Sequence, residues 1–168
     1  MKIAHNKRET MARVTAEYRA LNRTVLRLGE RGLGRPIPGF GARARIARER
    51  WLAKDALAHI VEWKRHALRA LRKERSDPDL RGLPIDRKNR LLYERWHHRP
   101  TRAVLAYHRS VQRDIVKALR ALPESYFKAP PRSPLWPNDL VGHSRAHRER
   151  HANLHRIPDL PLYEQVVQ

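Results

Sequence analysis

Four histidines recur at every fourth residue near the C-terminus of this chain: His143, His147, His151 and His155. On an α-helix, residues i and i+4 lie one above the other, so any neighbouring pair could offer two imidazole nitrogens to one metal ion. A further histidine, His59, lies on the apolar stripe of another predicted helix. Three neutral imidazoles from two helices, with one position left for water, make an open metal site of the kind used in catalysis.

A helical wheel indicates which histidines of this row face the interior. With about 100° per residue and Leu140 as the reference, His147 and His151 fall close to the centre of the apolar face. His143 and His155 fall on opposite flanks, because a row with four-residue spacing drifts by about 40° at each step. All four histidines therefore cannot converge, and the wheel favours the central pair.

The predicted metal site joins His59 to His147 and His151. Asp55, one turn before His59, could orient the imidazole ring by a hydrogen bond, although an acidic residue in the first turns of a helix is also favoured by the helix dipole. The alternative interpretation has no metal. Under this interpretation, His59 is a core histidine whose ring forms a hydrogen bond with a carbonyl group. The C-terminal histidines are then solvated residues that the helix dipole favours.

Four amphipathic helices would position these side chains. Hydrophobic residues recur at intervals of three and four along four segments, which cover about 10–29, 48–74, 100–122 and 138–156. Thr10 is a suitable N-cap for the first helix, and Gly29 a suitable end. A short additional helix is predicted over 86–98, and no run of alternating β-branched residues indicates a strand.

This pattern predicts an all-α protein, a four-helix bundle with one long crossover connection. The length of 168 residues suffices to bury one core. We therefore expect a single domain over 1–168, with the bundle over about 10–157 and a C-terminal tail over 158–168.

The amino-acid composition limits the metal ligands and nucleophiles that this chain can use. The chain has no cysteine, which excludes disulfides, thiolate ligands and a cysteine nucleophile, and leaves histidine and carboxylates as the strong metal ligands. No segment resembles a signal peptide or approaches the roughly 18 apolar residues of a membrane span. We expect a cytoplasmic protein that does not associate with membranes.

Net charge is the other unusual property, since 37 basic and 17 acidic residues give +20. Such a charge could serve nucleic-acid binding through phosphate contacts, or it could reflect arginine-rich solvent faces. Basic residues occur in every segment and do not alternate with aromatic residues, which favours solvent faces with weak, non-specific nucleic-acid affinity. If the charge is functional, the segment Arg35–Arg50 is the expected rim of the binding face, above all through Arg43, Arg45, Arg48 and Arg50.

Several segments together resemble the DinB-like (YfiT-like) superfamily of four-helix bundles, most closely its ClbS/DfsB-type branch. The run Trp-Leu-Ala-Lys-Asp-Ala-Leu-Ala-His-Ile-Val-Glu-Trp over 51–63 is similar to that family's second-helix signature. The run Leu-Pro-Ile-Asp-Arg-Lys-Asn-Arg-Leu-Leu-Tyr-Glu over 83–94 resembles its short segment before the third helix, and 114–127 resembles the end of that helix. Ser-Arg-Ala-His-Arg-Glu-Arg-His over 144–151 resembles its closing histidine pattern, so the likeness covers about 10–157.

The resemblance implies a divalent metal ion, zinc or nickel, held by three histidines, and it selects His147 and His151. In an alternative register that some relatives show, the pair is His143 and His147. The activities implied are those of thiol-dependent transferases, isomerases and detoxification hydrolases. This chain departs from the family in Arg148, which replaces an aromatic residue, in its charge, and in the arginine-rich insertion at 31–48.

Two functional hypotheses follow. The first is a metal-dependent hydrolase or thiol-dependent transferase that detoxifies small reactive electrophiles, with a metal-activated water or thiolate as the nucleophile. The second is a non-enzymatic basic helical module that binds DNA or an acidic partner and whose histidines are structural. The sequence leaves open whether the chain is an enzyme, which metal and small-molecule substrate it binds, and whether it forms a homodimer.

Overall fold

The computed structural model describes residues 6–37, 49–128, 140–151 and 154, without the side chain of His151. Its α-helices are α1 (Lys7–Leu33), α2 (Ala53–Leu71), α3 (Ile85–His97), α4 (Thr101–Ala121), α5 (Glu124–Lys128) and α6 (Gly142–Ala146). A 3₁₀ turn (Pro78–Leu80) precedes α3, and a π-helical turn (His147–His151) continues α6. Within the described residues the one β-type pairing is an isolated bridge between Pro36 and Leu52. The predicted all-α class is confirmed.

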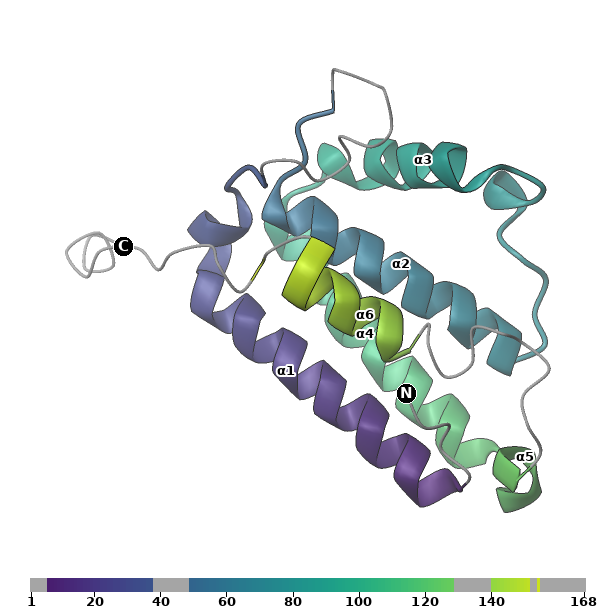
Figure 1. Cartoon of the computed structure of the whole chain (residues 1–168). Helices are drawn as coiled ribbons and strands as arrows, with labels where there is room; N and C mark the ends of the chain where they lie inside the picture. The colour runs from purple at the N-terminus through teal and green to yellow at the C-terminus, as the bar shows by residue number, and fades with distance from the viewer. Residues whose placement is uncertain (1–5, 38–48, 129–139, 152–153, 155–168) are drawn as a thin grey trace.

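The long helices α1, α2 and α4 run beside one another, and α6 lies between α1 and α2 on the opposite side from α4 (Figure 1). α3 packs against α2 on the side away from α1 (Figure 1). α1, α2 and α4 supply most of the largest fully buried side chains, among them Leu21, Leu57, Ile60, Ile115 and Leu119. Each such side chain contributes about 1.5–3 kcal/mol when it is removed from water, so the apolar stripes hold the helices together.

The ends of α1 differ from those expected. Asn6, not Thr10, is the N-cap, because its side chain accepts a hydrogen bond of 2.7 Å from the backbone N–H of Glu9. Gly29 adopts φ 59°, a left-handed conformation that glycine tolerates best, and interrupts the helix as predicted. Helical turns resume after this kink and continue to Leu33.

The prediction of one regular α-helix over 138–156 is wrong in where the helix begins and in the type of its later turns. Within the described residues it begins at Gly142, and it changes to a π-helical turn at His147. Four arginines were expected at the rim of a nucleic-acid-binding face. Of these four, only Arg50 is among the described residues. The C-terminal tail over 158–168 also lies outside them.

The N-terminus of α2 is joined to the corner between α3 and α4. The Asp55 carboxylate accepts hydrogen bonds from the backbone N–H of Leu52 (2.9 Å) and from Nζ of Lys54 (3.0 Å), and lies 2.8 Å from Nδ1 of His97. Lys54 Nζ also donates to the backbone carbonyls of Trp96 and His97. All of these groups are polar and shielded from water, so their hydrogen bonds fix α3 against α2.

Among the described residues, no helix is both long enough and apolar enough to span a membrane.

Candidate metal centre

Three histidine side chains meet between α2 and α6. His59 comes from the middle of α2, whereas His143 and His147 lie one turn apart on α6 and its continuation. One nitrogen of each ring lies within 4.8 Å of the chosen nitrogens of the other two. The Nε2 atoms of His59 and His147 are 3.3 Å apart, which matches the roughly 3.3–3.4 Å expected for two imidazoles on one tetrahedral zinc ion with bonds of about 2.0–2.1 Å. The His59–His147 pair therefore has the spacing that a shared metal ion requires, and His143 lies close enough to contribute a third nitrogen.

The surroundings of His59 keep its imidazole ring neutral, which is the form that binds a metal ion. Its side chain is only 5% exposed, and the rings of Trp51 and Trp63 lie 5.9 and 6.3 Å away, centroid to centroid. Burial, reinforced by His147 and then by His143, lowers the pKa of His59 well below its usual range. The ring is thus neutral near pH 7, as a metal ligand must be.

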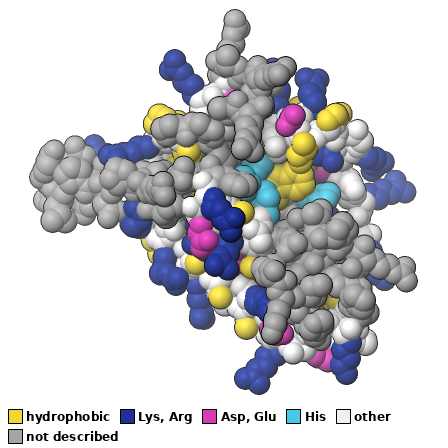
Figure 2. Space-filling model, viewed as in Figure 1, with side chains coloured by type: hydrophobic (Ala, Val, Ile, Leu, Met, Phe, Trp, Pro, Cys, Tyr) yellow, Lys and Arg dark blue, Asp and Glu magenta, His cyan; other side chains and the backbone are white. Residues whose placement is uncertain are grey.

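The cluster can be reached from outside the protein. His143 and His147 are half-buried rather than buried. Figure 2 shows histidine side chains at the surface of this face, beside a patch of hydrophobic side chains. An ion bound there could keep one coordination position for a water or a small ligand.

The 3.3 Å contact between His59 and His147 has a second interpretation. Two neutral imidazoles of suitable tautomers would form a hydrogen bond at the same distance. His143 favours the metal interpretation, because its ring centroid lies 5.2 Å from that of His59 and 4.4 Å from that of His147. A hydrogen bond between two imidazoles needs no third ring, whereas a site with three histidine ligands does.

The segment that begins at α6 presents two different faces, each formed by residues four apart. His143 and His147 face His59 on α2, whereas Ser144 and Arg148 face Glu17 on α1. Ser144 donates from Oγ to Oε1 of Glu17 at 2.8 Å, and Arg148 donates through Nε and Nη2 at 3.2 and 3.0 Å. The buried carboxylate on α1 therefore sets the rotation of α6, and with it the direction of the histidine pair.

Two cations lie near Glu17, and Arg148 is the one that bonds to it directly. Its side chain is 14% exposed and is paired with both Glu17 and Glu149. Lys64 on α2 is also buried, at 3% exposure. Burial lowers the pKa of Lys64 to about 8; the charge of Glu17 opposes this shift and that of Arg148 adds to it. Glu17 is thus the common counter-charge of two shielded cations.

Sequence reasoning placed His59, His147 and His151 together and left His143 on a flank. The structure brings His59 and His147 together with His143, while the side chain of His151 lies outside what is described. The helical wheel placed His143 on a flank because its reference, Leu140, precedes the helix and is not a valid origin. The alternative register, His143 with His147, is the one whose side chains lie beside His59. The π-helical turn, which does not advance by about 100° per residue, begins only at His147 and therefore affects the residues after it.

Asp55 does not have the expected role of orienting His59. Its two oxygens are occupied by Leu52, Lys54 and His97, so it caps α2 and fixes the corner between α3 and α4. The hydrogen bond from the backbone N–H of Leu52 to its carboxylate is the half of a capping box that the third helical residue supplies, and it explains the position of Asp55 three residues into the helix.

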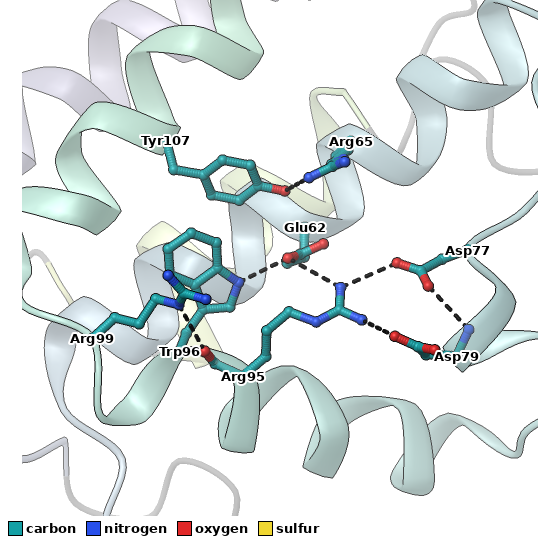
Figure 3. Close-up of polar contacts among 8 residues, drawn as sticks. All are labelled: Glu62, Arg65, Asp77, Asp79, Arg95, Trp96, Arg99 and Tyr107. Atoms are coloured by element: carbon teal, nitrogen blue, oxygen red, sulfur yellow. Dashed lines mark hydrogen bonds and ion pairs between the residues drawn. The ribbon is translucent and has the colours of Figure 1, made fainter.

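A second buried carboxylate, Glu62, joins α2 to α3 (Figure 3). It accepts hydrogen bonds from Nε1 of Trp96 at 2.7 Å and from Nη1 of Arg95 at 3.5 Å. Arg95 also pairs with Asp77 and Asp79, each at 3.1 Å. This network fixes the residue next to Trp63, whose ring lies 5.7 Å from that of His143.

The other described histidines do not join the cluster. His66 lies beside Trp63 at 5.7 Å, and His98 is exposed at the end of α3. His108 is buried against Tyr18, and burial, together with the charge of Lys64, lowers its pKa to about 3. His108 is therefore a neutral core residue.

Sequence reasoning missed the polar residues that position α6. Glu17 lies on the apolar stripe of α1, three residues after Val14 and four before Leu21. A carboxylate in such a position signals a buried ion pair, but the sequence does not say which of the many basic residues is its partner.

Comparison of the chain with protein families, with curated proteins and with solved structures gives no match.

Proposed function

We propose that this chain binds one divalent metal ion, zinc or nickel, through His59, His143 and His147. The observation that carries the proposal is the convergence of three imidazoles from two helices within 4.8 Å. Imidazole donors without thiolates suit zinc and nickel. The fit is supported by the lowered pKa of His59, which leaves its nitrogen free of a competing proton at neutral pH.

The rest of the site supports chemistry at the ion rather than simple storage. The three histidines leave a tetrahedral site one ligand short, and a bound ion would supply a nucleophile by lowering the pKa of a coordinated water. Trp51 and Trp63 provide apolar walls that exclude bulk water from one side of His59. Glu17 holds α6 so that His143 and His147 keep their direction.

The function we propose is that of a metal-dependent hydrolase or thiol-dependent transferase acting on a small reactive electrophile. The sequence resemblance to DinB-like bundles supports this reading. So does the packing of α1, α2, α4 and α6 around one core, with a long connection before α6. We propose on the same grounds that the fold is a four-helix bundle of DinB-like topology.

Metal binding is tested first. The protein is stripped with a chelator, reloaded with zinc or nickel, dialysed, and analysed for metal content and by calorimetric titration. We expect one ion per chain. His59→Gln, His143→Gln and His147→Gln should each weaken binding by at least about 100-fold, since loss of even a residue that only orients a ligand costs 10–100-fold.

Two further variants serve as controls. His66 lies on α2 near the cluster, and His98 lies at the exposed end of α3. The variants His66→Gln and His98→Gln should therefore both retain the ion. His151→Gln decides the register: retention of the ion supports His143 as the third ligand, whereas its loss restores the His151 assignment. A chain that binds no ion with all three histidines intact would refute the proposal.

Catalysis is tested separately on the metal-loaded protein. Activated esters and epoxides are offered with and without a small thiol, and turnover is compared with that of the His59→Gln variant. Turnover that requires both the ion and His59 supports the enzyme. Tight metal binding without turnover of any of these substrates would argue for a structural ion.

A further inference from the structure

A groove runs between α1 and α4, well away from the histidine cluster. Its volume is about 650 Å³. From α1 the lining residues are Thr15, Tyr18 and Arg19, and from α4 they are Arg109, Gln112, Arg113, Val116, Lys117 and Arg120. Five of these nine side chains are cationic and none is acidic.

The cations of α4 form a regular row. Arg109, Arg113 and Lys117 follow one another at four-residue spacing, and Arg120 comes three residues later. Residues at this spacing share one face of a helix and are about 6 Å apart along its axis. All four are exposed, as is Arg19 on the opposite wall. The row therefore offers one positive charge at each helical turn.

These charges are not neutralised by the acidic residues of the described chain. The ion pairs found among the described side chains involve other cations, such as Arg72, Arg95 and Arg148. Asp114 is the acidic residue of α4, and its carboxylate lies 3.7 Å from the guanidinium of Arg72, the C-cap of α2. Elsewhere on the described surface several cations pair with carboxylates, as Arg13 does with Glu9 and Arg90 with Glu94, whereas the lining of the groove contains no carboxylate.

We propose that this groove binds the phosphate backbone of a single nucleic-acid strand. A linear row of cations with an opposing cation matches a linear polyanion better than a small anion, which needs a few donors at one point. The partly exposed ring of Tyr18 adds an aromatic surface, supported from behind by His108 at a centroid distance of 4.9 Å. A cationic groove with an aromatic surface is the usual combination for single-strand binding.

The proposal is independent of the metal site. It also revises the expectation from the sequence that the charge is merely spread over the surface. Basic residues do occur on every long helix, but the groove between α1 and α4 gathers five of them, and no acidic residue lines it.

The test compares two triple variants of equal charge. Arg109→Gln with Arg113→Gln and Lys117→Gln removes the row, and glutamine keeps the helix propensity. A control with Arg75→Gln, Arg81→Gln and Arg87→Gln neutralises three exposed residues near α3. Both variants change the net charge by three, from +20 to +17, and circular dichroism verifies that each remains folded.

Binding of a fluorescent 20-nucleotide single strand is measured by anisotropy between 50 and 200 mM salt. For single strands the slope of log affinity against log salt is about 0.7 per phosphate contact, so removal of the row should make it shallower by about 2. The control variant should keep the wild-type slope. The metal-site variant His147→Gln should keep it as well, which separates this proposal from the metal site.

Four outcomes would overturn the proposal. Equal loss of slope in both triple variants would mean diffuse attraction to the whole protein, and an unchanged slope in the groove variant would exclude the groove. Competition by polyglutamate as strong as that by unlabelled strand would assign the groove to an acidic protein partner. Binding of a duplex with the same dependence on the row would show that the groove follows a backbone without preference for single strands.

Discussion

Replacement of the buried lysine of α2 tests the electrostatics of the core. Lys64 is 3% exposed, and its burial lowers the pKa from 10.5 to about 8. Between these two values the unfolded chain binds more protons than the folded chain, so the free energy of unfolding must rise with pH. A difference of about 2.5 pKa units corresponds to about 3 kcal/mol in total.

The size of the effect at each pH follows from the same two values. The folded state carries the full penalty at pH 7, and this penalty falls by about 1 kcal/mol at pH 9 and by about 2–3 kcal/mol at pH 10. Lys64→Met keeps an unbranched side chain of similar length and removes the charge. We expect this variant to be more stable than the wild type at pH 7 and to lose that advantage by these amounts as pH rises.

The assay is urea unfolding followed by far-ultraviolet circular dichroism at pH 7, 8, 9 and 10. The informative quantity is the difference in unfolding free energy between variant and wild type, because other titrating groups contribute equally to both. Lys128→Met, at an exposed lysine of α5, controls for the loss of one positive charge. A difference that stays constant from pH 7 to pH 10 would refute the assignment of Lys64 as a buried, strained cation.

Three further predictions concern single contacts. Glu17→Gln leaves Arg148 and Lys64 without their shared carboxylate and should destabilise the fold by about 3 kcal/mol; a loss below 1 kcal/mol in urea unfolding would contradict a buried ion pair. Asp55→Asn weakens the cap of α2 and the bond to His97 and should cost about 1–3 kcal/mol, with an unchanged unfolding midpoint as the contrary result. Zinc at 100 times its dissociation constant should stabilise the wild type by about 2.7 kcal/mol, and an equal effect on a variant without the histidine cluster would place the ion elsewhere.

The helices could be predicted from the sequence because their stripes are long and regular. Hydrophobic residues at three- and four-residue spacing locate α1, α2 and α4 to within a few residues. The boundaries were less predictable, as the shift of the N-cap from Thr10 to Asn6 shows, because both residue types cap helices well.

The candidate site could be predicted only in part. His59 is conspicuous as a histidine within an apolar stripe, but the register of the C-terminal row depends on where α6 begins and on its change to a π-helical turn. Neither property follows from hydrophobic periodicity. Glu17 and Arg148 are 131 residues apart, and no local pattern in the sequence pairs them.

The position of α6 connects the polar core with the histidine cluster. α6 itself has only five residues, and an isolated helix of that length would not be stable in water. On the side of α1 it is held by Glu17 through Ser144 and Arg148, at hydrogen-bond distances of 2.8 to 3.2 Å. On the side of α2 it presents two of the three imidazoles, and an ion shared with His59 would supply there the attachment that Glu17 supplies on α1. Arg148 therefore fits a metal site, because its ion pair with Glu17 fixes the segment that carries His143 and His147.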